Sequence, residues 1–191
     1  MRLPDPLRSR AVLLGFDTFT DSGLPDLPAV THNVDDLAEV FTSPWGTALP
    51  DKHCTRRREA APTAGLADLA SIGARLVAAA EEAEDLLLVY YAGHGLIDPD
   101  GELYLSLPGT SSEPDLVAWT GIPFTLVRRT LANARADSRV LILDCCFSGL
   151  AIGAMATTTS VVAGQLEVAG TCTLGRVIDS RDPALPEGEI V

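Results

Sequence analysis

Two short stretches of the sequence combine residues capable of covalent chemistry with neighbouring glycines. Residues 90–95 (YYAGHG) carry His94 between two glycines, and residues 144–149 (DCCFSG) carry two adjacent cysteines. A thiol beside an imidazole suits nucleophilic acyl transfer, because the imidazole stabilises the thiolate and later protonates the leaving amine. Flanking glycines let backbone N–H groups approach the reacting carbonyl. These residue types indicate a cysteine nucleophile that works with His94.

Both stretches directly follow apolar runs rich in β-forming residues. Residues 85–92 (DLLLVYYA) and 139–143 (RVLIL) are typical of central strands that are covered on both faces. In a parallel sheet, ligands bind beyond the carboxyl ends of the strands. If these two strands are neighbours, His94 and a cysteine meet at the same rim of the sheet.

The rest of the chain alternates between strand and helix patterns. Strands are predicted at Arg10–Gly15, at the edge of the sheet (53–57) and at the end of the pattern (170–177). Helices are predicted at 34–41 with Asn33 as N-cap, at 66–83 and at 123–134. Strands that alternate with helices imply βαβ units. The sequence therefore predicts an α/β fold, a three-layer α/β/α sandwich with a mainly parallel sheet.

Three further segments do not fit this alternation. We expect residues 16–31 to form a loop, and residues 151–164 to form a loop or a frayed helix. Residues 101–107, with the turn at 98–101, are expected to form a small surface hairpin.

Composition limits the class of protein. The chain has 191 residues, enough for one domain: an extension at 1–9, a catalytic domain at 10–177 and a tail or linker at 178–191 are expected. Acidic residues outnumber basic ones 26 to 14, for a net charge of −12. We therefore expect no nucleic-acid partner and no membrane partner.

Cysteine usage and the absence of a signal-like segment indicate the cellular compartment in which the protein is expected. The four cysteines show no CxxC spacing, no signal-like apolar stretch follows the first residues, and no apolar run is long enough to span a membrane. We expect a soluble, cytoplasmic protein with reduced thiols.

The two motifs, in this order and at the ends of expected strands, resemble the His and Cys motifs of the caspase/metacaspase clan of cysteine peptidases. The bacterial, orthocaspase-like branch fits best. His94 precedes Cys146 by 52 residues, near the roughly 50 of the caspase pattern. The resemblance runs from residue 10 to about residue 177. It implies a caspase-like fold and a cysteine endopeptidase whose catalytic dyad is His94 and Cys146, acting on a protein or peptide substrate.

The resemblance also distinguishes the two adjacent cysteines. In the family pattern Asp-x-Cys-x-Ser-Gly, the nucleophile stands two residues after the Asp, which selects Cys146 over Cys145. Strand alternation agrees that the two neighbours cannot share an environment, so Cys145 is expected to face the core. By resemblance, the backbone amides of Gly95 and Cys146 are the oxyanion donors.

Asp144 departs from the caspase motif, which has Gln at that position. The departure looks like the metacaspase arrangement, which implies that Asp144 lines the P1 pocket and selects Arg or Lys, since a carboxylate pairs bidentately with a guanidinium. Metacaspases bring a second acid from the loop that enters the first helix. Here Asn33 stands at that position, and Asp35 and Asp36 lie just beyond it. We take Asp35 as the second substrate-binding candidate.

Each of these residues also has a purely structural interpretation. His94 could be a hydrogen-bonded structural histidine, and Asp144 could cap the turn after its strand through a local bond. Tyr90 and Tyr91 alternate between the faces of a central strand and are expected in the core.

Other polar residues are assigned no function. His32 and His53 have no partner at metal-ligand spacing and are expected at the surface or in loops. Cys54 beside His53 is not enough for a metal site. The run RRR at 56–58 is expected to be a solvated edge that blocks strand pairing.

The alternative function is a catalytically inert or partner-dependent caspase-fold interaction or regulatory module. Full caspase-like units continue beyond the strand that is expected here at residues 170–177, with a small-subunit portion. We expect that portion to be largely absent from a chain that ends at Val191. A small-subunit chain or fused effector domains are therefore possible partners. A Cys–His dyad requires no cofactor. Some metacaspases need calcium, but no calcium site is readable in the sequence.

Overall fold

The computed structural model describes residues 3–58, 66–146, 161–163 and 173–180. Among these residues, six strands form one sheet in the order β2-β1-β3-β7-β9-β8, and three short strands form a second sheet, β4-β5-β6. The bounds of the larger sheet are β1 Arg10–Gly15, β2 Cys54–Arg58, β3 Leu86–Ala92, β7 Ser138–Cys145, β8 Val161–Ala163 and β9 Thr173–Ser180. Those of the smaller sheet are β4 Gly95–Ile97, β5 Leu103–Leu105 and β6 Ile122–Pro123.

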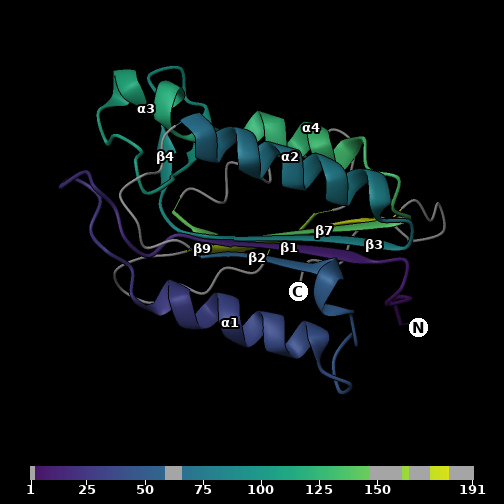
Figure 1. Ribbon diagram of the computed structural model, residues 1–191. Helices are drawn as coiled ribbons and strands as arrows, with labels where there is room; N and C mark the ends of the chain where they lie inside the picture. Colours follow the sequence, from purple (N-terminus) through teal and green to yellow (C-terminus); the bar gives the residue numbers. More distant parts are fainter. Residues whose placement is uncertain (1–2, 59–65, 147–160, 164–172, 181–191) are drawn as a thin grey trace.

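The larger sheet lies between two layers of helices (Figure 1). Helix α1 (Ala29–Thr42) covers one face, while α2 (Leu66–Glu82) and α4 (Phe124–Ala132) cover the other. The short helices α3 (Pro114–Thr120) and η1 (Asp51–His53) complete the described helices. This arrangement is the predicted α/β/α sandwich.

The core consists of two apolar clusters, one on each face of the sheet. Alternate residues of β1 and β3 enter opposite clusters, because successive side chains of a strand point to opposite faces. Val12 and Val89 pack with residues of α2 and α4, whereas Leu13 and Tyr90 pack with residues of α1. Burial on both faces explains why these strands are apolar throughout.

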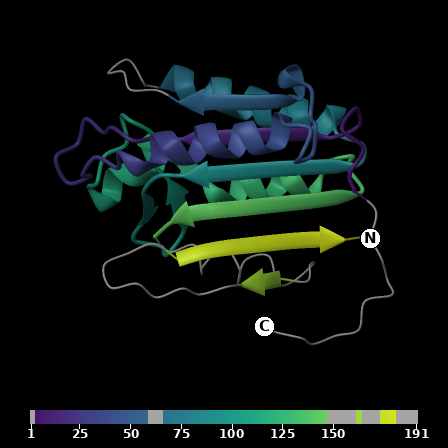
Figure 2. The same ribbon diagram turned by 90° about the horizontal axis from the view of Figure 1, so that it is seen from below.

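The central strands run in parallel and bring their carboxyl ends to one rim. Strands β2, β1, β3 and β7 are mutually parallel neighbours, and β9 runs antiparallel to β7 (Figure 2). The strand before His94 and the strand before the cysteines are therefore neighbours, which is the condition under which the two motifs were expected to meet at one rim. The prediction of an edge strand near residues 53–57, which is β2, is confirmed.

The first helix begins earlier than predicted. Helix α1 starts at Ala29 after Pro28, so Asn33 lies inside the helix and is not its N-cap, and the preceding loop is shorter than residues 16–31. The buried residues Val30, Val34 and Ala38 extend the apolar repeat one turn towards the N-terminus. Pro28 suits a helix start because its φ of −61° is already helical.

Other differences arise where the chain packs against distant segments. His53 is buried rather than exposed, because its Nδ1 lies 3.0 Å from Arg10 Nη1 and 3.1 Å from the Pro6 carbonyl oxygen. Helix α3 was not predicted. Residues 161–163, expected in a loop or a frayed helix, form strand β8; most of that segment lies outside the described residues.

The predicted hairpin at residues 101–107 is present, with β4 and β5 antiparallel, and β6 adds a third strand to it. Its predicted place on the surface is wrong, because Leu103, Leu105 and Leu107 are buried in the core cluster on the α2 side. The last strand, β9, begins three residues later than predicted and extends to Ser180. Within the described residues, no helix combines the length and the apolar character needed to cross a bilayer.

Candidate active site

Strand β7 assigns the residues of the cysteine motif to opposite faces. Leu143 and Cys145 are buried among residues of the α2 and α4 layer, whereas Asp144 is half-buried on the other side. Cys145 is 0% exposed, and Cys146, in the turn after the strand, is half-buried. The prediction that the two cysteines have different environments is confirmed, and Cys146 is the more accessible of the two.

The turns that carry His94 and Cys146 are in direct contact. Strands β3 and β7 pair up to Ala92 and Asp144, and the Gly93 N–H then donates to the Asp144 carbonyl oxygen at 3.3 Å. A Cβ atom at Gly95 would lie only 2.1 Å from the Cys146 carbonyl oxygen. Only a glycine at position 95 allows the two turns to approach this closely.

The imidazole ring of His94 is contacted by the loop between β1 and α1. His94 Nε2 lies 2.8 Å from the carbonyl oxygen of Pro25, and the rings of His94 and Phe19 are 4.8 Å apart, tilted by 55°. A carbonyl oxygen only accepts hydrogen bonds, so Nε2 must carry the proton. In the neutral ring, Nδ1 is therefore the basic nitrogen.

The backbone of His94 is held from the opposite side by a buried hydrogen-bond network. The His94 N–H donates to Ser106 Oγ at 3.0 Å, and the Ser106 N–H donates to the His94 carbonyl oxygen at 2.9 Å. The hydroxyl of Tyr91 lies 2.9 Å from the same carbonyl oxygen and 3.1 Å from Ser106 Oγ. Tyr91 and Ser106 are both 0% exposed, so the backbone of His94 is held firmly in place.

Asp144 is contacted by residues that are distant in the sequence. Its Oδ2 accepts from Asn33 Nδ2 at 3.3 Å and from the Tyr90 hydroxyl at 3.2 Å. Asn33 thus lies beside Asp144, at the place where the resemblance expects a second acid. Asp35 follows two residues later, about 200° further round helix α1, and so lies on a different face of the helix from Asn33.

One comparison with known proteins identifies the family of this chain. The family model of the caspase domain, of the C14 family of peptidases, matches residues 8–181. The chain belongs to the caspase-domain family. This family consists of cysteine peptidases, and the resemblance drawn from the two motifs is confirmed. No match was found among the curated proteins.

Two of the remaining cysteines lie in less reactive surroundings. Cys54 and Cys145 are buried free thiols, and burial raises the pKa of the Cys54 thiol, so it stays protonated at neutral pH. Cys172 lies outside the described residues. Within the described part of the chain, no group of three or more His, Cys, Asp or Glu side chains is arranged to hold a metal ion.

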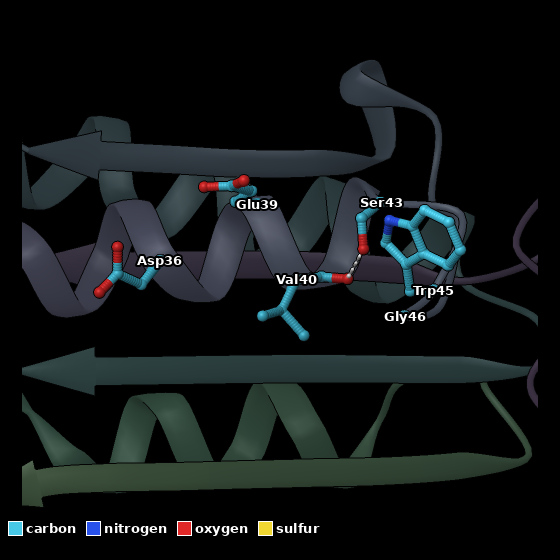
Figure 3. Close-up of a pocket in the computed structure, with 6 residues that line it drawn as sticks. All are labelled: Asp36, Glu39, Val40, Ser43, Trp45 and Gly46. Atoms are coloured by element: carbon cyan, nitrogen blue, oxygen red, sulfur yellow. Dashed lines mark hydrogen bonds between the residues drawn. The ribbon is translucent and has the colours of Figure 1, made fainter.

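A hollow on the outer face of α1 is separate from the motifs. Its volume is about 400 Å³, and it lies at the C-terminal end of the helix (Figure 3); it is lined by Asp36, Glu39, Val40, Ser43, Trp45 and Gly46. Trp45 is 93% exposed. None of these lining residues belongs to the loop or the turns that surround His94 and Cys146, so we do not count this hollow as part of the candidate site.

Three residues of the site were not singled out from the sequence for the roles they have. Pro25 contributes a backbone carbonyl, which leaves no signature in a side-chain pattern. Phe19 lies in a loop without periodicity, and its contact with His94 joins positions that are distant in the chain. Asn33 was considered as a helix cap and as the substitute for an acid. The family motif had put Asn33 at the position of the second acid, so this residue did carry a signal in the sequence, although not for a hydrogen bond to Asp144.

Proposed function

We propose that this caspase domain is a cysteine endopeptidase, with Cys146 as the nucleophile and His94 as the general base and acid. One observation carries the proposal: the Nε2 proton of His94 is engaged by the Pro25 carbonyl, which leaves Nδ1 basic on a turn that touches the backbone of Cys146. A base next to a thiol, with its orientation set by a third group, is the arrangement that activates a nucleophile.

In the proposed reaction, His94 Nδ1 accepts the thiol proton of Cys146, and the thiolate attacks the scissile carbonyl carbon. The tetrahedral intermediate collapses as the C–N bond breaks, and the His94 imidazolium donates its proton to the leaving amine. Water, deprotonated by His94, then attacks the thioester. The peptide leaves as a carboxylic acid, and the thiol of Cys146 is restored.

The oxyanion would be stabilised by the backbone amides of Gly95 and Cys146. Both belong to the two turns that are in contact, and a glycine at 95 keeps that approach open. Preorganised backbone donors of this kind contribute roughly 10²- to 10³-fold in rate.

Asp144 is proposed to select Arg or Lys at P1. Its carboxylate is half-buried on the face of the sheet covered by α1, close to the Cys146 turn. Asn33 and Tyr90 each donate to Oδ2. These donors orient the carboxylate and contribute no competing charge, so a guanidinium could still bind it. A P1 aspartate would be repelled.

The proposal is tested with fluorogenic peptides that end in Arg, Lys or Asp, with and without calcium. Wild type is expected to cleave after Arg or Lys, and Cys146→Ala and His94→Ala are expected to lose at least about 10³-fold in kcat/KM. Cys145→Ala should keep most of its activity and serves as the matched control.

Labelling separates this function from its alternative. An electrophilic peptide should modify Cys146 and leave Cys54 unmodified in the native protein, as read by mass spectrometry of digested fragments. If no peptide is cleaved and Cys146 is not labelled, the peptidase proposal is wrong and an inert or partner-dependent module is favoured. Cleavage after Asp would contradict the role of Asp144. A dependence on added calcium would show that the dyad alone is insufficient.

A further inference from the structure

The loop at residues 16–28, between β1 and α1, contacts the His94 ring in two places. Phe19 packs against the ring, with centroids 4.8 Å apart, and the Pro25 carbonyl oxygen accepts the Nε2 proton at 2.8 Å. The orientation of the imidazole therefore depends on where this loop lies, although the loop is separated from His94 by nearly 70 residues of sequence.

The 16–28 loop is closed by its own hydrogen bonds. The Leu27 N–H donates to the Asp17 carbonyl oxygen at 2.7 Å and joins the two ends of the loop. The Phe19 N–H donates to Asp26 Oδ1 at 3.1 Å. These bonds couple Phe19 to the part of the loop that contains Pro25, so the two contacts with His94 move together.

The tip of the loop is attached to the segment after β5 by the carboxylate of Asp21. Asp21 Oδ2 accepts from the Ser112 N–H at 2.8 Å, and Oδ1 accepts from the Ser112 hydroxyl at 2.9 Å and from the Gly23 N–H at 2.7 Å. A Cβ at Gly23 would lie 2.3 Å from Ser112 Oγ, so the attachment is close. Thr20 adds a second link, with its N–H donating to the Pro108 carbonyl oxygen at 2.9 Å.

The attachment point belongs to the same segment that holds the His94 backbone. Ser106 binds both the N–H and the carbonyl of His94, and Ser112 lies six residues further along the chain. Between them, the Leu107 N–H donates to Thr110 Oγ1 at 2.7 Å, and Thr110 is 0% exposed. Residues 106–112 therefore hold the backbone of His94 directly. They hold its ring indirectly, through the Asp21 and Thr20 contacts of the 16–28 loop.

We propose that Asp21 is a positioning residue for His94: by fixing the 16–28 loop to Ser112, it keeps the Pro25 carbonyl on Nε2 and holds Nδ1 towards the nucleophile. Its effect on turnover rests on the proposed peptidase function, whereas its effect on the imidazole does not. Displacing a catalytic group by about 1 Å can cost about 100-fold in rate. A residue that fixes the position of His94 can therefore control activity without touching substrate.

The imidazole is observed directly by NMR of protein labelled with ¹⁵N-histidine. In wild type, the Nε2–H of His94 should exchange slowly with water, because it is bonded to Pro25. In Asp21→Ala this proton should exchange about tenfold faster or more, as expected when a loop contact opens locally. Asp98→Ala is the matched control, since Asp98 is also a half-buried turn carboxylate that accepts two backbone N–H groups.

Graded variants keep the test decisive if Asp21→Ala folds poorly. Ser112→Ala removes only the hydroxyl donor and should increase the exchange rate less than Asp21→Ala does. Asp21→Asn retains one acceptor and one polar group beside Ser112. The His94 Nε2–H should therefore exchange much more slowly in this variant than in Asp21→Ala. If the exchange rate of His94 Nε2–H in Asp21→Ala and Ser112→Ala equals that of wild type, the proposal is wrong.

Kinetics provide the second readout. With an Arg-ending peptide, Asp21→Ala should lower kcat about 10- to 100-fold and change KM less than about twofold, because the residue does not touch substrate. If wild type has no peptidase activity but Asp21→Ala still releases the His94 proton, the proposed function falls and the positioning role stands. If kcat falls while the His94 proton stays protected, the positioning role is wrong.

Discussion

The hydroxyl of Tyr91 shows how a core residue supports a rim residue. Tyr91 belongs to the core cluster on the α2 side, as expected from the sequence, yet its hydroxyl reaches the carbonyl oxygens of His94 and Ser106, both at 2.9 Å. Buried polar groups must be hydrogen-bonded, because an unpaired one has lost its water without compensation. Tyr91 therefore meets a structural need and holds the turn of the candidate catalytic histidine.

We predict that Tyr91→Phe lowers the free energy of unfolding by about 1–3 kcal/mol, because the buried carbonyl oxygens of His94 and Ser106 lose the one hydroxyl donor that they share, although His94 keeps its bond from the Ser106 N–H. Urea unfolding measures this loss. The half-buried Tyr104 provides the control: Tyr104→Phe removes a more accessible hydroxyl and should cost less, about 0.5–1.5 kcal/mol. An equal loss in the two variants would show that the buried hydrogen bonds of Tyr91 stabilise the fold no more than an accessible hydroxyl does.

At the scale of elements, the site depends on two strands ending side by side. Strands β3 and β7 were both recognisable from the sequence because each is a continuous apolar run, and their parallel pairing brings Gly95 against Cys146. The contact tolerates no side chain at position 95. Gly73, in helix α2, presents the opposite situation, because a Cβ there would have no neighbour within 4 Å.

The two glycines give a matched prediction with opposite signs. Gly95→Ala should destabilise the fold by about 1–3 kcal/mol through overpacking, and should reduce peptide cleavage by separating the two turns. Gly73→Ala should stabilise the fold by about 0.5–1 kcal/mol, since alanine is the better helix former. Thermal unfolding of both variants tests this. A Gly95→Ala variant as stable and active as wild type would rule out the close approach.

At the scale of the whole molecule, the candidate site lies at one rim of the sheet, where segments from several layers of an acidic chain meet. The loop after β1, the turn after β3 and the turn after β7 meet where the parallel strands end, while α1 supplies Asn33 from one face. Carboxylates outnumber basic groups, so the stability of the molecule below neutral pH depends on which acids are paired. Asp21 is one of these.

The hydrogen bonds of Asp21 predict the direction in which its contribution to stability changes at acidic pH. Hydrogen bonds from the Ser112 N–H, the Gly23 N–H and the Ser112 hydroxyl lower the pKa of Asp21 below its ordinary value, which is about 3.9. Its contribution to stability is therefore present above about pH 3.9 and is lost as the pH falls through the lowered folded pKa.

The corresponding measurement is the difference in thermal midpoint between wild type and Asp21→Asn. This difference should be constant from pH 7 to pH 5 and should shrink as the pH falls below about 3.9. Taking a difference cancels the titration of the other carboxylates. If the difference grew on acidification, the sign assigned to Asp21 would be wrong.

The sequence by itself determined the elements that have a strong local signal. The strands before His94 and before the cysteines, helix α2 and the edge strand all follow from hydrophobic periodicity, and the two motifs at the strand ends identified both the family and its candidate dyad. Parallel neighbours share a rim, so the meeting of the two motifs was predictable as well.

Only the tertiary structure decided what surrounds the candidate dyad. The Pro25 carbonyl and the Phe19 ring on His94, Asn33 on Asp144 and Asp21 on Ser112 all join segments far apart in the chain. The path of a loop depends on long-range hydrogen bonds and not on local periodicity, and a backbone carbonyl has the same chemistry in every residue. For this reason the sequence predicted which residues react, while the fold determined which residues hold them in position.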